Sequence, residues 1–297
     1  MTESTLKDQP LAADTFARLP QGFTALVTGA GGGIGRAMLE ELLAHERCGR
    51  VLAVSRDVSR LPAHPALASL QADLTTDEGM ARLADWLREQ LDDTGQEENK
   101  EKENKEKEKH EENEENEPRP GQPPALILNT MGLLHEEAFE QHAALWPEKR
   151  LEDLDMAALT RLHQVNAFVP ALLLGMLAPR LRRRTPLIFA SLSARVGSIS
   201  DNRSGGWYAY RASKASHNML LKTAAIEIAR RNPEAVLVAL HPGTTDTELS
   251  APFQARVPEH KLFTPGYVAR RLLRVAGELS PEDSGGFRDW AGEPIDW

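Results

Sequence analysis

The chain has one cysteine, few aromatic residues and no excess of positive charge. With Cys48 alone among 297 residues, no internal disulfide is available, so nothing requires an oxidising compartment and we expect a cytoplasmic protein. Lys and Arg number 35 against 44 Asp and Glu, which leaves no basic footprint for nucleic acid. The most apolar stretch, residues 165–178, is interrupted by Asn166 and Pro170, so no membrane span is expected.

Negative charge is concentrated in one segment. Residues 97–117 hold eleven Glu and five Lys, and residues 92–124 have almost no apolar side chain, so this segment cannot bury a core. We predict a single domain over residues 23–297 with a disordered acidic insertion at 92–124, preceded by a flexible N-terminal lead at 1–22. The insertion is either a tolerated surface loop or a docking arm for a partner.

Short apolar runs alternate with longer amphipathic stretches along the rest of the chain. Buried strands are expected at 25–28, 51–54, 70–72, 125–128, 186–192 and 236–240, and helices at 34–45, 78–91, 154–177, 210–230 and 267–279. Parallel strands need crossover connections, and helices provide them. The pattern therefore predicts an α/β doubly wound parallel sheet, a Rossmann fold, with seven strands in the order 3-2-1-4-5-6-7.

A glycine-rich turn follows the first expected strand. Residues 28–35 read Thr-Gly-Ala-Gly-Gly-Gly-Ile-Gly and lead directly into an amphipathic helix. Glycines allow the backbone to approach a pyrophosphate, which free N–H groups and the positive end of the helix dipole then bind. The cofactor-binding residues predicted here are Thr28, Gly29, Gly33, Ile34 and Gly35.

The end of the second strand indicates which dinucleotide binds. Ser55 and Arg56 stand where an acidic side chain would accept a hydrogen bond from a ribose 2′-hydroxyl, and a guanidinium suits a 2′-phosphate instead. We therefore expect NADP, with NADPH preferred and NAD possible, although a register shift of one residue would put Asp57 at this place. Asp73, with Leu74 beside it, follows the third strand and is expected at the adenine.

One Tyr is followed by a Lys at a helical spacing. Tyr210 and Lys214 are four residues apart, so their side chains project from the same face of a helix. An ammonium close to a phenol lowers the pKa of the phenol by about one to three pH units and makes it a usable general acid and base.

These features together resemble the short-chain dehydrogenase/reductase family. The motifs Thr28-Gly29-x-x-x-Gly33-Ile34-Gly35, Tyr210-x-x-x-Lys214 and Pro242-Gly243 occur in that family's order, over roughly residues 24–292. Asn129-Thr130-Met131-Gly132 stands where the family has Asn-Asn-Ala-Gly. Residues 195–199, 205–214 and 241–243 further resemble the family's C-factor and sniffer-like branch.

The resemblance implies a role for each matching residue. Tyr210 would exchange a proton with the substrate oxygen, Lys214 would bind the nicotinamide ribose, and Asn166 would hold a water that relays protons to Lys214. Further cofactor contacts are expected from Asn129, Met131, Gly132, Pro242, Gly243, Thr245 and Thr247. No metal is implied, and family members are commonly dimers or tetramers.

The family's catalytic serine has two candidates in this chain. Ser191 and Ser193 both precede Gly197 at an unusual spacing, and we choose Ser193 as the hydroxyl that would hold the substrate oxygen. Trp207, Phe253, Trp290 and Trp297 are candidates for an apolar substrate wall.

Three functions are consistent with the sequence. The first is an NADP(H)-dependent oxidoreductase acting on a small carbonyl or alcohol. The second is a dinucleotide-binding signalling or regulatory protein in which catalysis is secondary. The third is a scaffold that works through the acidic insertion.

Overall fold

A parallel sheet of seven strands forms the centre of the protein. The structure, a computed structural model, describes residues 10–91, 123–137, 144–181 and 184–297. The strands are β1 (Phe23–Thr28), β2 (Cys48–Ser55), β3 (Leu67–Gln71), β4 (Leu126–Asn129), β5 (Leu187–Leu192), β6 (Ala235–His241) and β9 (Gly286–Asp289). Their order is β3-β2-β1-β4-β5-β6-β9, and every pairing is parallel. The predicted seven-strand Rossmann order is confirmed.

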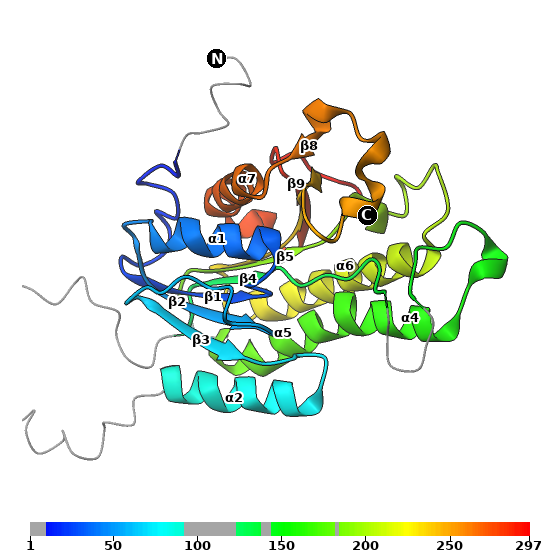
Figure 1. Ribbon diagram of the computed structural model, residues 1–297. Coiled ribbons are helices and arrows are strands. Elements are labelled where there is room, and N and C mark those ends of the chain that lie inside the picture. Colours follow the sequence, from blue (N-terminus) through cyan, green and yellow to red (C-terminus); the bar gives the residue numbers. More distant parts are fainter. Residues whose placement is uncertain (1–9, 92–122, 138–143, 182–183) are drawn as a thin grey trace, which may run out of the picture.

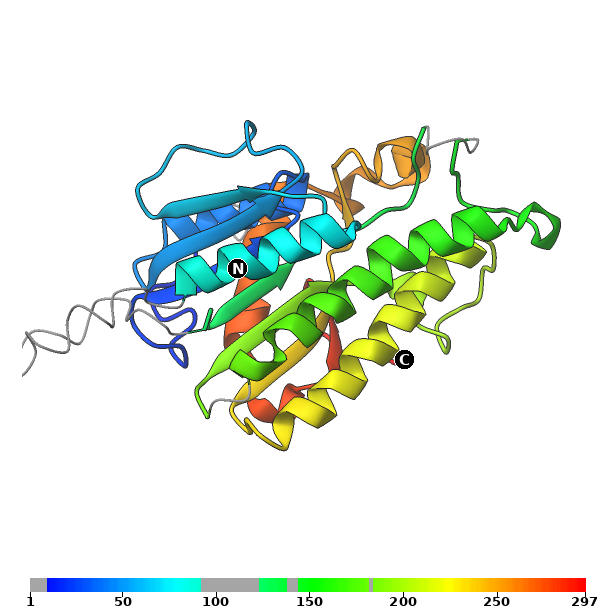
Figure 2. The ribbon, with the colours of Figure 1, turned by 90° about the horizontal axis from the view of Figure 1, so that it is seen from below.

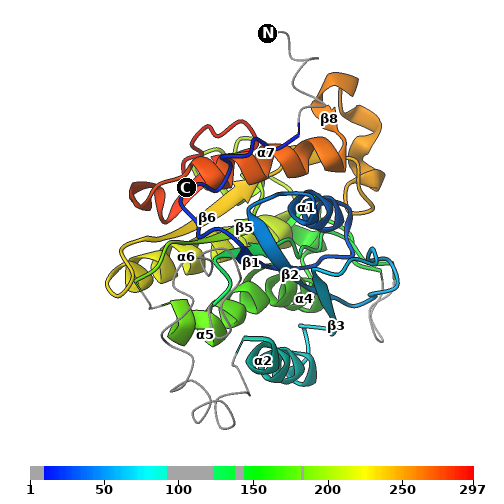
Figure 3. The same cartoon turned by 90° about the vertical axis from the view of Figure 1, so that its left-hand side faces the viewer.

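Helices cover both faces of the sheet, as Figures 1 and 3 show. On one face lie α1 (Gly33–Leu43) and α7 (Pro265–Glu278). On the other lie α2 (Asp77–Leu91), α5 (Val169–Leu181) and α6 (Tyr208–Ala229). Each strand alternates between the two faces: Val27 packs with α1 and α7, whereas Leu26 packs with α5 and α6. Two separate hydrophobic layers therefore hold each strand in register.

The long helix between β4 and β5 has an irregular centre. It consists of α4 (Met156–His163), a π-helical turn at Gln164–Phe168 and α5, and it runs alongside α6 (Figure 2). Among the described helices, the run Met156–Leu181 alone is long and apolar enough to cross a membrane, but half of its most apolar window is buried. Leu173 and Leu177 are fully buried against the sheet, which explains the apolar sequence as that of a core helix.

The N-terminal boundary of the domain lies earlier than predicted. Within the predicted flexible lead, Phe16 is fully buried and packs edge-on against Phe23, and Leu19 is 2% exposed. Arg18 Nη1 also donates to the carbonyl of Leu279. Residues 10–22 therefore belong to the folded body, because two large apolar side chains are buried there. Residues 1–9, and the predicted insertion except for residues 123–124, lie outside the described residues.

Short elements after β6 complete the fold. β7 (Thr244–Thr245) pairs with β8 (Leu262–Phe263), and between them run the 3-10 turns Ala251–Arg256 and Glu259–Lys261. This segment lies beyond the carboxyl ends of the central strands, where open α/β sheets bind ligands. Three further 3-10 turns are Leu151–Asp153, Arg195–Gly197 and Pro281–Asp283.

Candidate active site

The glycine turn, residues 28–35, leads into the N-terminus of α1, which lies next to a pocket. Gly29 has a φ of +77°, which favours glycine, and a Cβ on Gly35 would collide with the carbonyl oxygen of Gly29. Gly32 caps α1 without any side-chain hydrogen bond, so the N–H groups of the first turn keep their capacity to bind an anion. The pocket is lined by Gly29, Gly31 and Gly32, while Thr28, Gly33, Ile34 and Gly35 build the turn beneath it.

The pocket lies at the carboxyl ends of β1, β2, β3 and β4, where the strand order reverses between β1 and β4. Of the predicted residues it includes Gly29, Ser55, Arg56, Asp73, Leu74, Met131 and Gly132. The sequence did not single out Gly31, Gly32, Arg60, Thr75, Leu133, Arg161, Val165 and Glu248, which also line it. The predicted loop residues Pro242, Gly243, Thr245 and Thr247 stand outside its lining.

The tip of β2 presents two guanidinium groups to this pocket. Arg56 is exposed and, within the part of the chain that is described, makes no hydrogen bond or ion pair. Asp57 Oδ1 accepts hydrogen bonds from the amide and the hydroxyl of Ser59, which lower the pKa of Asp57. The carboxylate of Asp57 is therefore engaged within its own turn. Arg60, four residues after Arg56, adds a second cation.

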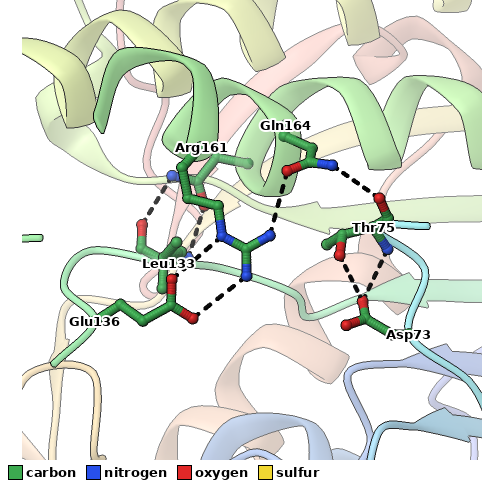
Figure 4. A network of polar contacts seen from close by, with 7 residues as sticks. Asp73, Thr75, Leu133, Glu136, Arg161 and Gln164 are labelled. Carbon is green, nitrogen blue, oxygen red and sulfur yellow. Dashed lines mark hydrogen bonds and ion pairs between the residues drawn. The ribbon is translucent and has the colours of Figure 1, made fainter. Parts of the chain in front are cut away.

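A polar network closes the β3 side of the pocket (Figure 4). Asp73 Oδ1 accepts from the amide and the hydroxyl of Thr75 at 2.9 and 2.7 Å. Gln164 Nε2 donates to the carbonyl of Thr75, and Arg161 donates to Gln164 Oε1 and to both carboxylate oxygens of Glu136. Burial on its own raises the pKa of Asp73, but the bonds from Thr75 and the nearby Arg side chains lower it below its ordinary value. Asp73 is thus an anionic acceptor at the predicted adenine position.

Asn129 connects three strands beneath the pocket. Its Oδ1 accepts from the Thr28 hydroxyl at 2.9 Å, and its Nδ2 donates to Ser191 Oγ at 2.8 Å. All three side chains are at most 1% exposed. Thr130 Oγ1 donates to the carbonyl of Thr28, so the loop after β4 is attached to the glycine turn. Asn129 therefore fixes the backbone around the pocket and does not itself line it.

Tyr210 and Lys214 lie side by side on α6, as predicted. Lys214 Nζ is 5.9 Å from the centroid of the Tyr210 ring, and the two side chains are 3% and 7% exposed, respectively. Lys214 Nζ donates to the carbonyl of Leu192 at 3.0 Å, and it lies 3.8 Å from the position of a Cβ on Gly132. The Tyr–Lys pair therefore faces the pocket-lining segment after β4.

The expected lowering of the pKa of Tyr210 by Lys214 is wrong. Burial raises the pKa of Tyr210 above its ordinary value, and burial lowers the pKa of Lys214 to about 8. Desolvation penalises each charged form and outweighs the attraction of the ammonium for a phenolate. Tyr210 therefore rests as a neutral proton donor.

Asn166 lies within the π-helical turn and reaches the same place. Its Oδ1 accepts from the amide of Leu133, and its Nδ2 donates to the carbonyl of Leu133 and to Ser213 Oγ. The Cβ position of Gly132 lies 3.9 Å from Asn166 Oδ1, close to Lys214 Nζ. The amide side chain of Asn166 thus holds the loop after β4 next to α6, and its Oδ1 retains one lone pair for a further hydrogen bond.

The two candidate serines point into the interior. Ser191 Oγ accepts from Asn129, and the Ser193 hydroxyl donates to Asn218 Oδ1 at 2.6 Å. Ser193 is 3% exposed. The residues of this segment that pack into the hydrophobic cluster around Tyr210 are Ala194, directly after Ser193, and Val196.

Aromatic rings form a wall next to Tyr210. Trp207 contacts Tyr210 and Phe253, with ring centroids 6.2 and 5.1 Å apart, and His135 stacks on Trp146 at 5.1 Å. Phe253 also contacts His135 and Trp146, so the five rings form one continuous group. Two of the four predicted wall residues lie elsewhere, because Trp290 packs on Phe263 and Trp297 stacks on Phe287.

The loop after β6 lies next to the glycine turn. The methyl group of Thr247 is 2.8 Å from the position of a Cβ on Gly33. Gly243 has a φ of +72°, and a Cβ there would meet Phe263 and Trp290, while Thr245 is 4% exposed and donates to the carbonyl of Pro242. Of the predicted residues in this loop, Thr247 therefore comes nearest to the start of α1.

Glu148 is a site residue that the sequence analysis missed. Its Oε2 accepts from the amide of Ala209, directly before Tyr210, and its carbonyl accepts from the amide of Trp207. Trp207 has a left-handed backbone, with φ 55°, and provides no side-chain cap for α6. A carboxylate 61 residues away in the sequence thus caps the helix that carries Tyr210 and Lys214.

The fold and the site together define a dinucleotide-binding α/β protein. The glycine turn lies where the strand order reverses between β1 and β4, and the Tyr210–Lys214 pair lies next to the pocket there. No family model matches the chain. The chain is 36% identical over 148 residues, 50% of its length, to the C-signal of Myxococcus xanthus, and the match covers 83% of that protein. It is 29% identical over 170 residues to 1-hydroxy-2-glutathionyl-2-methyl-3-butene dehydrogenase of Rhodococcus sp. (strain AD45), over 57% of this chain and 72% of that one.

Solved structures share the fold at lower identity. The NADPH-bound carbonyl reductase from chicken fatty liver superposes with a TM-score of 0.72 at 21% identity, covering 98% of this chain and 100% of that one. The carbonyl reductase Sniffer of D. melanogaster gives 0.69 at 18% identity, over 93% of this chain and 100% of that one. The chain belongs to the short-chain dehydrogenase/reductase family, and its match to the C-signal supports the resemblance to the C-factor branch. With Sniffer it shares the fold.

Proposed function

We propose that the protein is an NADP(H)-dependent oxidoreductase of the cytoplasm that transfers hydride between the nicotinamide and a small carbonyl or alcohol. The observation that carries this proposal is the buried Tyr210–Lys214 pair next to Gly132, which itself lines the pocket formed by the glycine turn. Two proteins of the same fold support this cofactor: the carbonyl reductase from chicken fatty liver has NADPH bound, and a putative short-chain dehydrogenase/reductase from Burkholderia multivorans has NADP bound.

The residues of the pocket fit an adenine dinucleotide. The free N–H groups at the N-terminus of α1 suit the pyrophosphate. The carboxylate of Asp73, which is held by the amide of Thr75, suits the adenosine. The guanidinium of Arg56, which has no ion-pair partner among the described residues, suits a 2′-phosphate, and Arg60 also lines the pocket. When bound, the cofactor supplies or accepts the hydride.

The proton chemistry belongs to α6. The phenol of Tyr210, whose pKa is raised by burial, is protonated at neutral pH and is the proposed proton donor to a carbonyl oxygen. Donation leaves a phenolate close to the Lys214 ammonium, which stabilises the new charge in a site of low dielectric constant. Asn166 fixes the loop of Leu133 next to Lys214 and is proposed to hold the water that returns a proton to it.

Ser193 is the proposed second donor to the substrate oxygen. A serine hydroxyl has one proton to donate, and that of Ser193 is engaged by Asn218. The proposed role therefore requires this hydroxyl to turn from Asn218 to the substrate. Thr245 and Thr247 are proposed to approach the nicotinamide and the phosphates from the loop after β6.

A substitution of Tyr210 by Phe tests the proposed function. We expect NADPH to bind to Tyr210→Phe as it does to the unaltered protein, since the phenol hydroxyl is not required by the pocket. Turnover with a panel of aldehydes and ketones should fall by about 10²- to 10⁴-fold. Unchanged turnover, or the absence of NADPH binding to the unaltered protein, would contradict the proposal.

The relationship to the Myxococcus C-signal favours a second candidate, a dinucleotide-binding signalling protein in which turnover is secondary. The same variant separates the two functions. A cellular phenotype that survives Tyr210→Phe but is lost when the nucleotide site is blocked would favour signalling.

We also propose that the protein is a homodimer or homotetramer. Leu172 on α5 and Met219 and Ile226 on α6 are 58%, 67% and 52% exposed, and these two helices lie next to each other. Apolar side chains gathered on neighbouring helices are typical of a surface that another subunit covers. Sedimentation of the unaltered protein and of Met219→Lys tests this assembly.

A further inference from the structure

An acidic side chain lies at the mouth of the proposed nucleotide pocket, on the loop of residues 246–250 that follows β7. This loop crosses from the glycine turn to the segment after β4. The methyl group of Thr247 lies against Gly33 at the start of α1, and Leu249 Cδ1 lies 3.6 Å from the Cβ position of Gly132. Glu248, between them, lines the pocket.

Glu248 bridges the two sides of this mouth. Its Oε1 is 3.1 Å from Nη2 of Arg60, which stands 188 residues earlier in the chain, on the loop after β2. Its main-chain carbonyl accepts from Nε2 of His135, one of the rings in the aromatic wall. Glu248 therefore links the Arg-bearing loop after β2 to the substrate side of the site.

The three Arg side chains that line the pocket differ in their ion-pair partners. Arg161 is paired with Glu136, Arg56 has no ion-pair partner among the described residues, and Arg60 is paired with Glu248. A nucleotide with a 2′-phosphate adds about two negative charges near Arg56 and Arg60. The carboxylate of Glu248 then both competes for Arg60 and repels the phosphate.

We propose that Glu248 is a specificity-determining residue that occupies Arg60 in the nucleotide-free protein and must release it when a 2′-phosphate binds. This inference rests on the proposed NADP(H) function. Glu248 weakens the binding of nucleotides that carry a 2′-phosphate and has little effect on those that lack it. It also makes the position of the 246–250 loop sensitive to the phosphate.

The size of the effect follows from exposure. The side chains of Arg60 and Glu248 are 52% and 87% exposed, so their ion pair is weak and is screened by salt. Removing the competing charge should strengthen the binding of a 2′-phosphate by about two- to fivefold at low ionic strength.

The test compares nucleotides that differ by the 2′-phosphate alone. NADPH, NADH, adenosine 2′,5′-bisphosphate and 5′-AMP are titrated calorimetrically into the full-length protein and into Glu248→Gln. The matched control is Glu259→Gln, an exposed Glu of the same β7–β8 segment. We expect Glu248→Gln to bind NADPH and the bisphosphate about two- to fivefold more tightly, with NADH and 5′-AMP unchanged and the difference shrinking in salt. The control should match the unaltered protein.

A second pair of variants tests the path through Arg60. In an Arg60→Ala background, Glu248→Gln should strengthen NADPH binding by a smaller factor, because Glu248 and the 2′-phosphate no longer compete for the guanidinium of Arg60. Equal strengthening for NADH, unchanged or weaker NADPH binding, or a full effect without Arg60 would each overturn the proposal. If the unaltered protein binds neither dinucleotide, the proposed function itself fails.

Discussion

The hydroxyl of Ser193 donates its proton to Oδ1 of Asn218, at 2.6 Å, in the interior of the protein. Asn218 in turn donates through Nδ2 to the carbonyl of Gly197. These bonds attach the segment after β5 to α6, one helical turn beyond Lys214. The serine is therefore part of the support for the catalytic helix, whatever it contributes to the substrate oxygen.

Replacing Ser193 by Ala tests its proposed role as the second donor. The loss of kcat should be smaller than that of Tyr210→Phe, because the Ser193 hydroxyl must leave Asn218 before it can donate to the substrate oxygen. We expect a loss of about 1 kcal/mol in the free energy of unfolding from the broken hydrogen bond. Steady-state kinetics and urea unfolding of the two variants measure these effects. A loss of stability with unchanged kcat would contradict the proposed donation and leave Ser193 as a support of α6 only. The companion variant Ala194→Ser places a hydroxyl in the Tyr210 cluster and should raise kcat if a second donor is otherwise missing.

Glu148→Ala should loosen the start of α6. The variant leaves the amide of Ala209 without its acceptor, which should cost about 1–2 kcal/mol of stability and lower kcat by displacing Tyr210. Glu148→Gln retains an oxygen acceptor and should recover most of both losses. Glu152→Ala, an exposed Glu four residues later, serves as the control. Equal losses for Ala and Gln would show that charge, and not the hydrogen bond, is what matters.

Stability should fall in mild acid through His217. Burial, with a further contribution from Lys214, lowers the pKa of His217 from 6.5 to about 3 in the folded protein. His217 is therefore protonated in the unfolded chain but stays neutral in the folded protein. The free energy of unfolding decreases as the pH falls from about 6.5 towards 3. Between pH 7 and 5 this loss should be about 2 kcal/mol.

Urea unfolding at the two pH values measures the loss. His217→Gln should reduce the pH dependence by this amount, whereas His260→Gln, which alters an exposed His, should not. A pH dependence that is the same in His217→Gln would mean that other groups cause the acid sensitivity.

Arg56→Ala should remove much of the preference for NADPH. Hydrogen bonds between a guanidinium and a phosphate contribute about 1.5–3 kcal/mol, so the affinity for NADPH should fall by about 10- to 100-fold and that for NADH should hold. Fluorescence titration with both nucleotides checks this, with the exposed Arg82 on α2 replaced by Ala as the control. Equal losses for the two nucleotides would place Arg56 away from the 2′-phosphate.

Features with a local signal were predictable from the sequence. Six of the seven strands of the sheet were expected near their observed positions, because runs such as Val51 to Val54 are continuously apolar and buried on both faces. The strand Gly286–Asp289 was not located, because Phe287 is its one large apolar residue. Tyr210 and Lys214 were found together because a spacing of four fixes two side chains on one helix face.

Features that depend on distant contacts were not predictable. Glu148 caps α6 across 61 residues, and Phe16 is buried by Phe23 and His45. The raised pKa of Tyr210 results from burial that no sequence spacing reveals. Glu248 and Arg60 meet across the pocket although 188 residues separate them.

The acidic segment of residues 92–124 connects to the folded domain at the edge of the sheet opposite the proposed nucleotide pocket. It follows α2, which ends at Leu91, and precedes β4, which begins at Leu126, so it enters at the amino end of the sheet. The proposed nucleotide pocket lies at the carboxyl ends of the same strands. The length and charge of this connection can therefore change without altering any residue that lines the proposed nucleotide pocket.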